Sequence, residues 1–465
     1  MINGSIEVME VAAKGYDLTK GSILGRLLLI AMPVMATQLF QMLFNLIDMF
    51  FVGRISSDAV AAVGSAGMYI WLSVAFFVIG GRGAEIGVSQ SIGNGDEQEA
   101  RRFATAAIGI AVALGSLYGL LMFSFAGFWI GLLRLQEAHV VADAVMYLRV
   151  ISISFPFMFL NNAITGIYNG LGNSRLPFYV KSIGLTINVI ITPIFIFVLD
   201  LGVRGAAMAT AIGFTLMGLM LILTVKMPKL CPFDGFRFRD VLQVEMKNVK
   251  QIFKWTLPMT VDSGTFTLLS MVIAGFVAQF GSDAVAAQRV GTQIESLSWL
   301  VGGGYAVAFT AFIGQNHGAK EWGRIRRGFK ISTVVKILWG LGVGLIMFFG
   351  GEWLFNLFID EPTTVAIGVS YMRILAVVQI PQCMEHLCAG AFDGAGNTMP
   401  PTIVSMTFNF LRVVVAYFLS QTALGLDGIW IAIALGNLTK GVFLTAWYLL
   451  WSRKTKLQRD QLTAI

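Results

Sequence analysis

One carboxylate, Asp48, lies inside an apolar stretch of sequence that is long enough to cross a lipid bilayer. Residues 28–53 read LLIAMPVMATQLFQMLFNLIDMFFVG. The amide and carboxyl residues of this stretch are three or four positions apart, so on an α-helix they share one face: Gln38, Gln41, Asn45 and Asp48. A carboxylate at membrane depth is costly unless it is protonated, is paired or borders a hydrated cavity. The stripe therefore predicts an ion-coupling site at Asp48, with a packing contact between helices as the alternative.

Further oxygen-bearing side chains occur in two later apolar stretches of the first half. Asn188 and Thr192 are one helical turn apart, and Thr210 lies in the next stretch. With Asp48 they could form an oxygen-rich pocket, which suits a proton or a hard cation such as Na⁺. We expect any sodium site to use Asp48, Asn188 and Thr210. No other metal site and no catalytic residue is predicted.

The second half carries a different polar set. Gln288, Thr292, Glu295 and Trp299 form one helical stripe, and Gln379, Gln382, Glu385 and His386 lie close together in a later stretch. We expect a broad substrate cavity bordered by polar residues of both halves: Gln38, Gln41, Asn45, Thr265, Gln293, Glu295, Gln379 and Gln382. For Glu295 and Glu385 the alternative is structural, namely ion pairs with Arg373, Arg412 or Lys440.

The elements that must position these residues are membrane-spanning helices. The 465 residues are 56% hydrophobic and 13% charged, far more apolar than a soluble protein of average make-up. Apolar windows of about 20 residues, the length that crosses a bilayer, recur along the chain. They predict twelve crossings, at 28–52, 59–81, 103–128, 146–168, 178–199, 204–226, 254–279, 285–313, 329–350, 364–391, 401–421 and 427–451.

Basic residues set the expected orientation. The chain has a formal net charge of +7, and its lysines and arginines crowd alternate loops, as the positive-inside rule describes for cytoplasmic loops. We therefore expect the protein to lie in the inner (plasma) membrane with both termini in the cytoplasm. Asp48 then lies in the outer half of its helix, about 30 Å from the cytoplasmic start near Leu28 at ~1.5 Å per residue.

The chain also repeats itself. Residues 57–62 and 282–287 both read SDAVAA, Pro33 matches Pro258 at the same offset, and GLGNSRLP at 170–177 resembles GAGNTMPP at 394–401. Such a match in register indicates a duplication. Because each half has six crossings, both halves run in the same direction and substrate is expected between them. The prediction is an all-α polytopic membrane protein with twelve transmembrane helices in two pseudo-symmetric six-helix bundles.

The repeat gives the expected domains. They are a cytoplasmic N-terminus (1–27), an N-lobe with six crossings (28–226), a cytoplasmic linker (227–253), a C-lobe with six crossings (254–451) and a cytoplasmic C-terminus (452–465). The three cysteines and three histidines show no spacing typical of a metal site. We expect small organic substrates and membrane lipids as partners, no nucleic acid, no cofactor besides a coupling ion, H⁺ or Na⁺, and a monomer.

With these motifs the chain resembles the multidrug and toxic compound extrusion (MATE) family. The resemblance covers 20–452 and depends on NLIDMFFVG, the two SDAVAA segments, RVGTQIESLSWL with FTAFIGQNHGA, and the paired GLGNSRLP and GAGNTMPP turns. It implies twelve helices in two lobes. It also implies secondary-active efflux of organic, often cationic, compounds that is driven by inward Na⁺ or H⁺.

The resemblance is nearest to the branch called DinF-like. Asp48, Asn188 and Thr210 match that branch's acid, asparagine and threonine, whereas Thr192 stands where it has a second aspartate. Phe266 and Gln382 stand where the other prokaryotic branch has its acids. Asp48 is thus the chief coupling candidate. A proton, which cancels one charge, is favoured over Na⁺, for which a second carboxylate is missing.

Three other functions are compatible with a polytopic chain. The first is a flippase or exporter of a lipid-linked sugar or other amphipathic metabolite in the same superfamily. The second is an integral membrane enzyme, which would need a cluster of histidines and acids or a nucleophile with its base. The third is a passive channel, which fits a duplicated bundle with one off-axis acid less well than alternating access does.

Overall fold

The computed structural model describes residues 15–135, 137–227, 230–231, 233 and 244–462. The described part consists of helices and their connections, without β-strands. The chain divides into two compact units. Unit 1 holds residues 1–260 and 314–321, and unit 2 holds residues 261–313 and 322–465.

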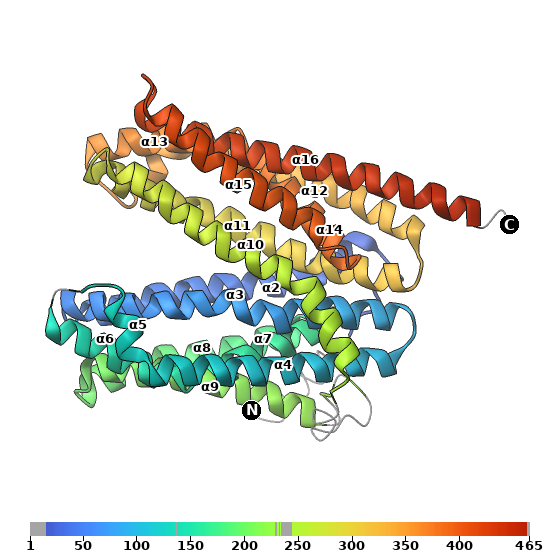
Figure 1. The fold of residues 1–465 in the computed structure, drawn as a ribbon, viewed down its shortest axis with the longest axis horizontal. Helices are drawn as coiled ribbons and strands as arrows, with labels where there is room; N and C mark the ends of the chain where they lie inside the picture. The colour runs from blue at the N-terminus through green and yellow to red at the C-terminus, as the bar shows by residue number, and fades with distance from the viewer. Residues whose placement is uncertain (1–14, 136, 228–229, 232, 234–243, 463–465) are drawn as a thin grey trace. The chain divides into compact units, whose positions relative to one another are not determined.

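Unit 1 is built on eight α-helices and one π-helical turn that run through the first half of the chain (Figure 1). They are α2 (Ile23–Gly53), α3 (Ser57–Gly93), α4 (Glu97–Ser124), α5 (Ala126–Gly131), α6 (Ala138–Ser152), α7 (Phe155–Gly170), α8 (Arg175–Pro193), η1 (Ile194–Val198) and α9 (Gly202–Lys226). Helix α3 packs against α4, α6 and α7, while α8 packs between α2 and α9. Helix α9 also contacts α6 and α7, which brings the helices of the predicted ion site together.

The second half of the chain contains seven helices. They are α10 (Met246–Ala278), α11 (Ser282–Gly318), α12 (Trp322–Asn356), α13 (Pro362–Ala376), α14 (Gln379–Gly394), α15 (Met399–Ser420) and α16 (Gly425–Leu462). In unit 2, α16 packs against α13, α14 and α15, and α12 packs against α13 and α14. The buried apolar core of unit 2 draws on α10, α11, α12, α13, α15 and α16, including Ile273, Ala284, Met347 and Trp430.

Ten helices of the described chain are long and apolar enough to cross a membrane, and two bent helix pairs bring the total to twelve if each pair is one span. The twelve predicted crossings thus have counterparts, but two are not straight. Helices α6 and α7 meet at 48°, and α13 and α14 meet at 54°. Pro156 and Pro381 lie in the first turn of the second helix of each pair. Because proline lacks the N–H that would continue the preceding helix, each break has a local cause.

Some helix ends differ from the predicted segments. Helix α10 begins at Met246, inside the segment 227–253 that the sequence predicts as a linker, and α16 continues to Leu462, past the predicted last crossing. Hydropathy detects only the apolar part of a helix. The polar turns at 246–253 and 452–462 are therefore invisible to it. Residues 234–243, where the linker is predicted, lie outside the described residues.

Close helix crossings depend on glycine at equivalent positions of the two halves. A Cβ atom on Gly166 of α7 would lie 2.0 Å from the carbonyl oxygen of Gly81 on α3. In unit 2 a Cβ atom on Gly390 of α14 would lie 2.9 Å from the carbonyl oxygen of Ala306 on α11. Small residues let helix backbones approach in a membrane, where the hydrophobic effect does not hold helices together. The repeat therefore preserves a packing contact as well as a hydropathy pattern.

Candidate functional site

Helix α2 carries the polar stripe that the sequence predicts. Nε2 of Gln41 donates to Oδ1 of Asn45 one turn later, at 3.3 Å. Gln38, Gln41 and Asp48 are half-buried, whereas Asn45 is exposed. Most of the large apolar side chains on the other faces of α2 are exposed, among them Phe40, Leu46 and Phe50. The helix thus presents one polar face and a broad apolar surface suited to lipid.

Asp48 is the member of the stripe with an unsatisfied polar atom. Its Oδ1 atom is buried and has no hydrogen-bond partner. A carboxylate oxygen without a donor is costly in an apolar environment, and this cost falls when the acid binds a proton.

Tyr147 is the neighbour of Asp48 that sequence analysis missed. It lies on α6, its side chain is buried, and its hydroxyl interacts with the charge of Asp48 and with the hydroxyl of Thr210 on α9. The hydroxyl can donate to the charged acid or accept from the protonated one. Tyr147 thereby joins α2, α6 and α9 at the predicted ion site. Nothing in the sequence separates it from the other nine tyrosines.

Asn188 and Thr192 of α8 lie beside this group but bond to each other. The Thr192 hydroxyl donates to the carbonyl oxygen of Asn188 at 2.8 Å and lies 3.0 Å from its Oδ1. Nδ2 of Asn188 donates to the carbonyl oxygen of Ala209 at 2.9 Å, next to Thr210. The side chains of Asn188, Thr192 and Thr210 are all buried. Asn188 thus ties α8 to α9, and the hydroxyl of Thr210 donates to Ala206 of its own helix at 2.9 Å.

In unit 2 the structure brings together three of the predicted cavity residues. Oε2 of Glu295 accepts from the hydroxyl of Tyr371 at 3.0 Å. Nε2 of Gln379 lies 3.4 Å from Oε1 of Gln382, and both glutamines lie beside Glu295. Ser298 adds a bond to Oε1 of Gln379 at 3.1 Å. Glu295, Gln379 and Gln382 are buried, so they form a packed polar network.

Two further cavity candidates have different surroundings. Gln293 is exposed, because two residues along a helix turn a side chain to nearly the opposite face from Glu295. Thr265 on α10 is half-buried. Neither belongs to the Glu295 network.

One of the ion pairs predicted as a structural role for Glu295 and Glu385 is present in unit 2. Nζ of Lys440 lies 3.3 Å from Oε1 of Glu385. Arg412 interacts with the charges of both Glu385 and Glu295, and Nδ1 of His386 lies 2.8 Å from the carbonyl oxygen of Gln382. Glu385 and Glu295 therefore have positively charged neighbours, although Oε1 of Glu295 is, like Oδ1 of Asp48, buried without a hydrogen-bond partner.

Comparison with known proteins places the chain among transport proteins. The MatE family model matches residues 33–194 and 258–418, one segment in each half. The chain is 26% identical over 448 residues to the probable multidrug resistance protein NorM of Thermotoga maritima, with 94% of each chain covered. It is 24% identical over 415 residues to the FAD transporter of Shewanella oneidensis, covering 86% of this chain and 88% of that one.

The fold has a counterpart of known structure. A MOP superfamily transporter from Pyrococcus furiosus superposes with a TM-score of 0.88 and 22% identity, and the match covers 95% of this chain and 99% of that one. At this identity the likeness establishes the fold alone.

Proposed function

Because the chain belongs to the MatE family, whose model matches both halves, it is a polytopic membrane transporter and not an enzyme, and we propose that it exports organic drugs and toxins by H⁺ antiport. The proposed substrates are cationic or amphipathic compounds, which the family resemblance implies. The relative of T. maritima is named a probable multidrug resistance protein, which supports drug export. We place the protein in the inner membrane with both termini in the cytoplasm. The assignment to the DinF-like branch remains a prediction.

The observation that carries the proposed coupling is the buried, unpartnered Oδ1 of Asp48. A proton satisfies this atom directly, because the protonated acid becomes a hydrogen-bond donor and loses its charge. Each proton that moves inward contributes about 2.3 kcal/mol per 100 mV of membrane potential. In the proposed cycle Asp48 takes up a proton from outside, the lobes change conformation once it is neutral, and substrate is released.

Sodium is the less favoured coupling ion for a structural reason. Hard cations are held by several oxygen ligands at once. Here the hydroxyl of Thr192 donates to Oδ1 of Asn188, and Nδ2 of Asn188 donates to the carbonyl oxygen of Ala209. Asp48 is the one carboxylate among the predicted ion-coupling residues. A Na⁺ ion would have to displace these bonds and would be neutralised by a single acid.

Anionic metabolites are a second candidate substrate class, because one relative is named an FAD transporter. Unit 2 buries the side chains of Lys336, Arg412 and Lys440, which are the kind of groups that bind anionic metabolites. In this alternative the chain exports an amphipathic metabolite, as a flippase of lipid-linked sugars would.

A susceptibility panel in a host that lacks its own efflux pumps tests the substrate class. Expression of the protein should raise tolerance to cationic dyes and drugs and lower their accumulation. Secretion of FAD with no change in dye accumulation would reject drug export in favour of the metabolite alternative. An Asp48→Asn strain with equal expression is the control for transport by this protein.

A further inference from the structure

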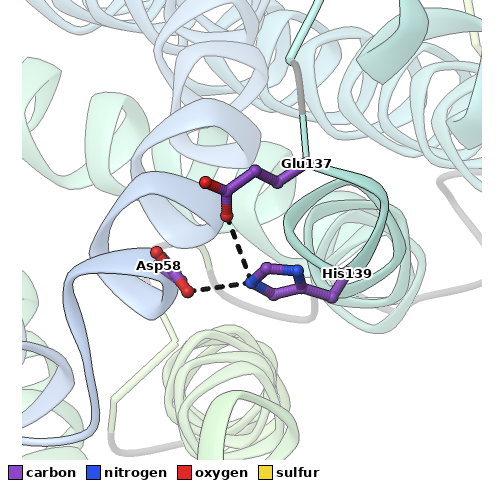
Figure 2. Close-up of side chains that lie close together, drawn as sticks. All are labelled: Asp58, Glu137 and His139. Atoms are coloured by element: carbon purple, nitrogen blue, oxygen red, sulfur yellow. Dashed lines mark hydrogen bonds and ion pairs between the residues drawn. The ribbon is translucent and has the colours of Figure 1, made fainter.

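Three side chains that could ligate a metal meet where α3 and α6 begin. Nε2 of His139 lies 2.8 Å from Oδ2 of Asp58 and 3.3 Å from Oε2 of Glu137 (Figure 2). Asp58 is in the first turn of α3 and Glu137 is the N-cap residue of α6. The three ligand atoms lie within 4.8 Å of one another. Sequence spacing does not predict this group, because Asp58 and His139 are far apart in the chain.

The second half of the chain shows what the same contact looks like without an imidazole. Asp58 belongs to the first SDAVAA segment and Asp283 to the second, and Glu137 and His139 correspond to Glu361 and Thr363. In unit 2 the hydroxyl of Thr363 donates to Oδ2 of Asp283 at 3.4 Å. A hydroxyl is therefore sufficient to tie the two helix starts. In unit 1, by contrast, Asp58 contacts an imidazole and Glu137 also lies nearby, and neither feature is needed to join the two helix starts.

The two carboxylates of the group would be stabilised by a bound cation. A neutral imidazole can donate one proton from Nε2, yet that atom faces two carboxylates. The charge of Asp143 also acts on His139. Within the part of the chain that the structure describes, no lysine or arginine lies within ion-pair distance of Asp58 or Glu137. A divalent ion in place of the proton would contact both carboxylates and neutralise them.

We propose that Asp58, Glu137 and His139 form a site for a divalent transition metal of the Zn²⁺ class. One imidazole nitrogen and two carboxylate oxygens are ligands that suit Zn²⁺, which commonly takes three protein ligands and a water molecule. Glu137 and His139 are exposed and Asp58 is half-exposed, so the metal can enter from the aqueous phase. Because the ligands come from α3 and from the start of α6, the bound metal holds these helices together.

Titration of the purified, tag-free protein with ZnCl₂ in detergent tests the site. The full-length chain should bind one Zn²⁺ with an affinity that His139→Thr lowers at least roughly tenfold, because the variant loses one of three ligands. Zn²⁺ should raise the thermal unfolding midpoint of the natural protein, since a ligand that binds only the folded state stabilises it, but not that of His139→Thr. Mg²⁺, which prefers oxygen ligands and its own waters, should not replace Zn²⁺.

Three variants control for loss of structure and for other zinc ligands. His139→Thr copies the hydroxyl contact of the second half, so without metal it should unfold at the same temperature as the natural protein. Asp283→Asn and His386→Gln alter the equivalent aspartate and another histidine, and both should keep the site. Equal Zn²⁺ binding by the natural protein and His139→Thr, or absence of stoichiometric binding by the natural protein, would overturn the proposal.

Discussion

The hydroxyl of Thr192 lies 3.0 Å from Oδ1 of Asn188, so these two α8 residues of the predicted ion site satisfy each other. Asp48 is the one carboxylate of the group. The choice of coupling ion then depends on whether a second negative charge is present at position 192. A single substitution at position 192 can add this second charge.

Thr192→Asp should convert the protein toward sodium coupling. The substitution adds a second carboxylate beside Asn188, so Na⁺ would gain both a ligand and a neutralising charge. An inward Na⁺ gradient should drive export from proteoliposomes that contain this variant, and it should not drive export by the natural protein. Thr192→Asn supplies an oxygen of similar size without charge and should leave export dependent on H⁺. If Na⁺ drives neither variant, charge at position 192 does not select the ion.

Tyr147→Phe should slow proton-driven transport beyond what its small loss of folding stability explains. The ring keeps its buried position on α6, but the hydroxyl that interacts with Asp48 and Thr210 is lost. The loss of a polar group beside a buried charge costs about 1–3 kcal/mol, so proton-driven export should fall roughly tenfold.

Tyr168→Phe is the matched control for this effect. Tyr168 is also buried in unit 1, and its hydroxyl lies 3.0 Å from both Oγ1 of Thr224 and the carbonyl oxygen of Leu230. It should lose a similar amount of stability and keep its transport rate. Equal transport rates in the two variants would show that the Tyr147 hydroxyl has no part in coupling.

Gly166→Ala should destabilise the helix crossing in unit 1. The new methyl group would lie 2.0 Å from the carbonyl oxygen of Gly81, so α3 and α7 must separate at a cost of about 1–3 kcal/mol. The thermal unfolding midpoint in detergent should fall. Gly342→Ala on α12 has no neighbour within 4 Å of its added Cβ atom and should leave the midpoint unchanged or higher. A drop of the same size in both variants would contradict this explanation.

The segment before α2 should become sensitive to trypsin when Gln315 is replaced. The backbone N–H of Leu18 donates to Oε1 of Gln315 at 2.9 Å, and Nε2 of Gln315 donates to the carbonyl oxygen of Gly170 at 2.9 Å. Gln315→Leu removes both bonds. The loss of about 1 kcal/mol at Leu18 should raise local opening, and with it cleavage after Lys20, about fivefold. Gln421→Leu, which removes an exposed glutamine bonded to Ser420, should not change the cleavage rate.

Local spacing explains how much of the fold and the candidate site the sequence predicts. The stripe that ends at Asp48 and the pair Asn188–Thr192 lie on one helix face each, so helical periodicity is enough to find them. Tyr147 and the group around His139 were missed because their partners come from other helices. The bend between α6 and α7 was also missed, since hydropathy stays high across a break that Pro156 causes.

The most direct test of the account compares natural protein and Asp48→Asn in proteoliposomes under separately imposed H⁺ and Na⁺ gradients. Asparagine keeps the shape of the protonated acid but cannot release a proton. The natural protein should export a cationic dye when an H⁺ gradient alone is imposed, and Asp48→Asn should bind the dye, fold normally and fail to respond to the gradient. Export driven by Na⁺ alone, or full H⁺-driven export by Asp48→Asn, would contradict proton coupling at Asp48.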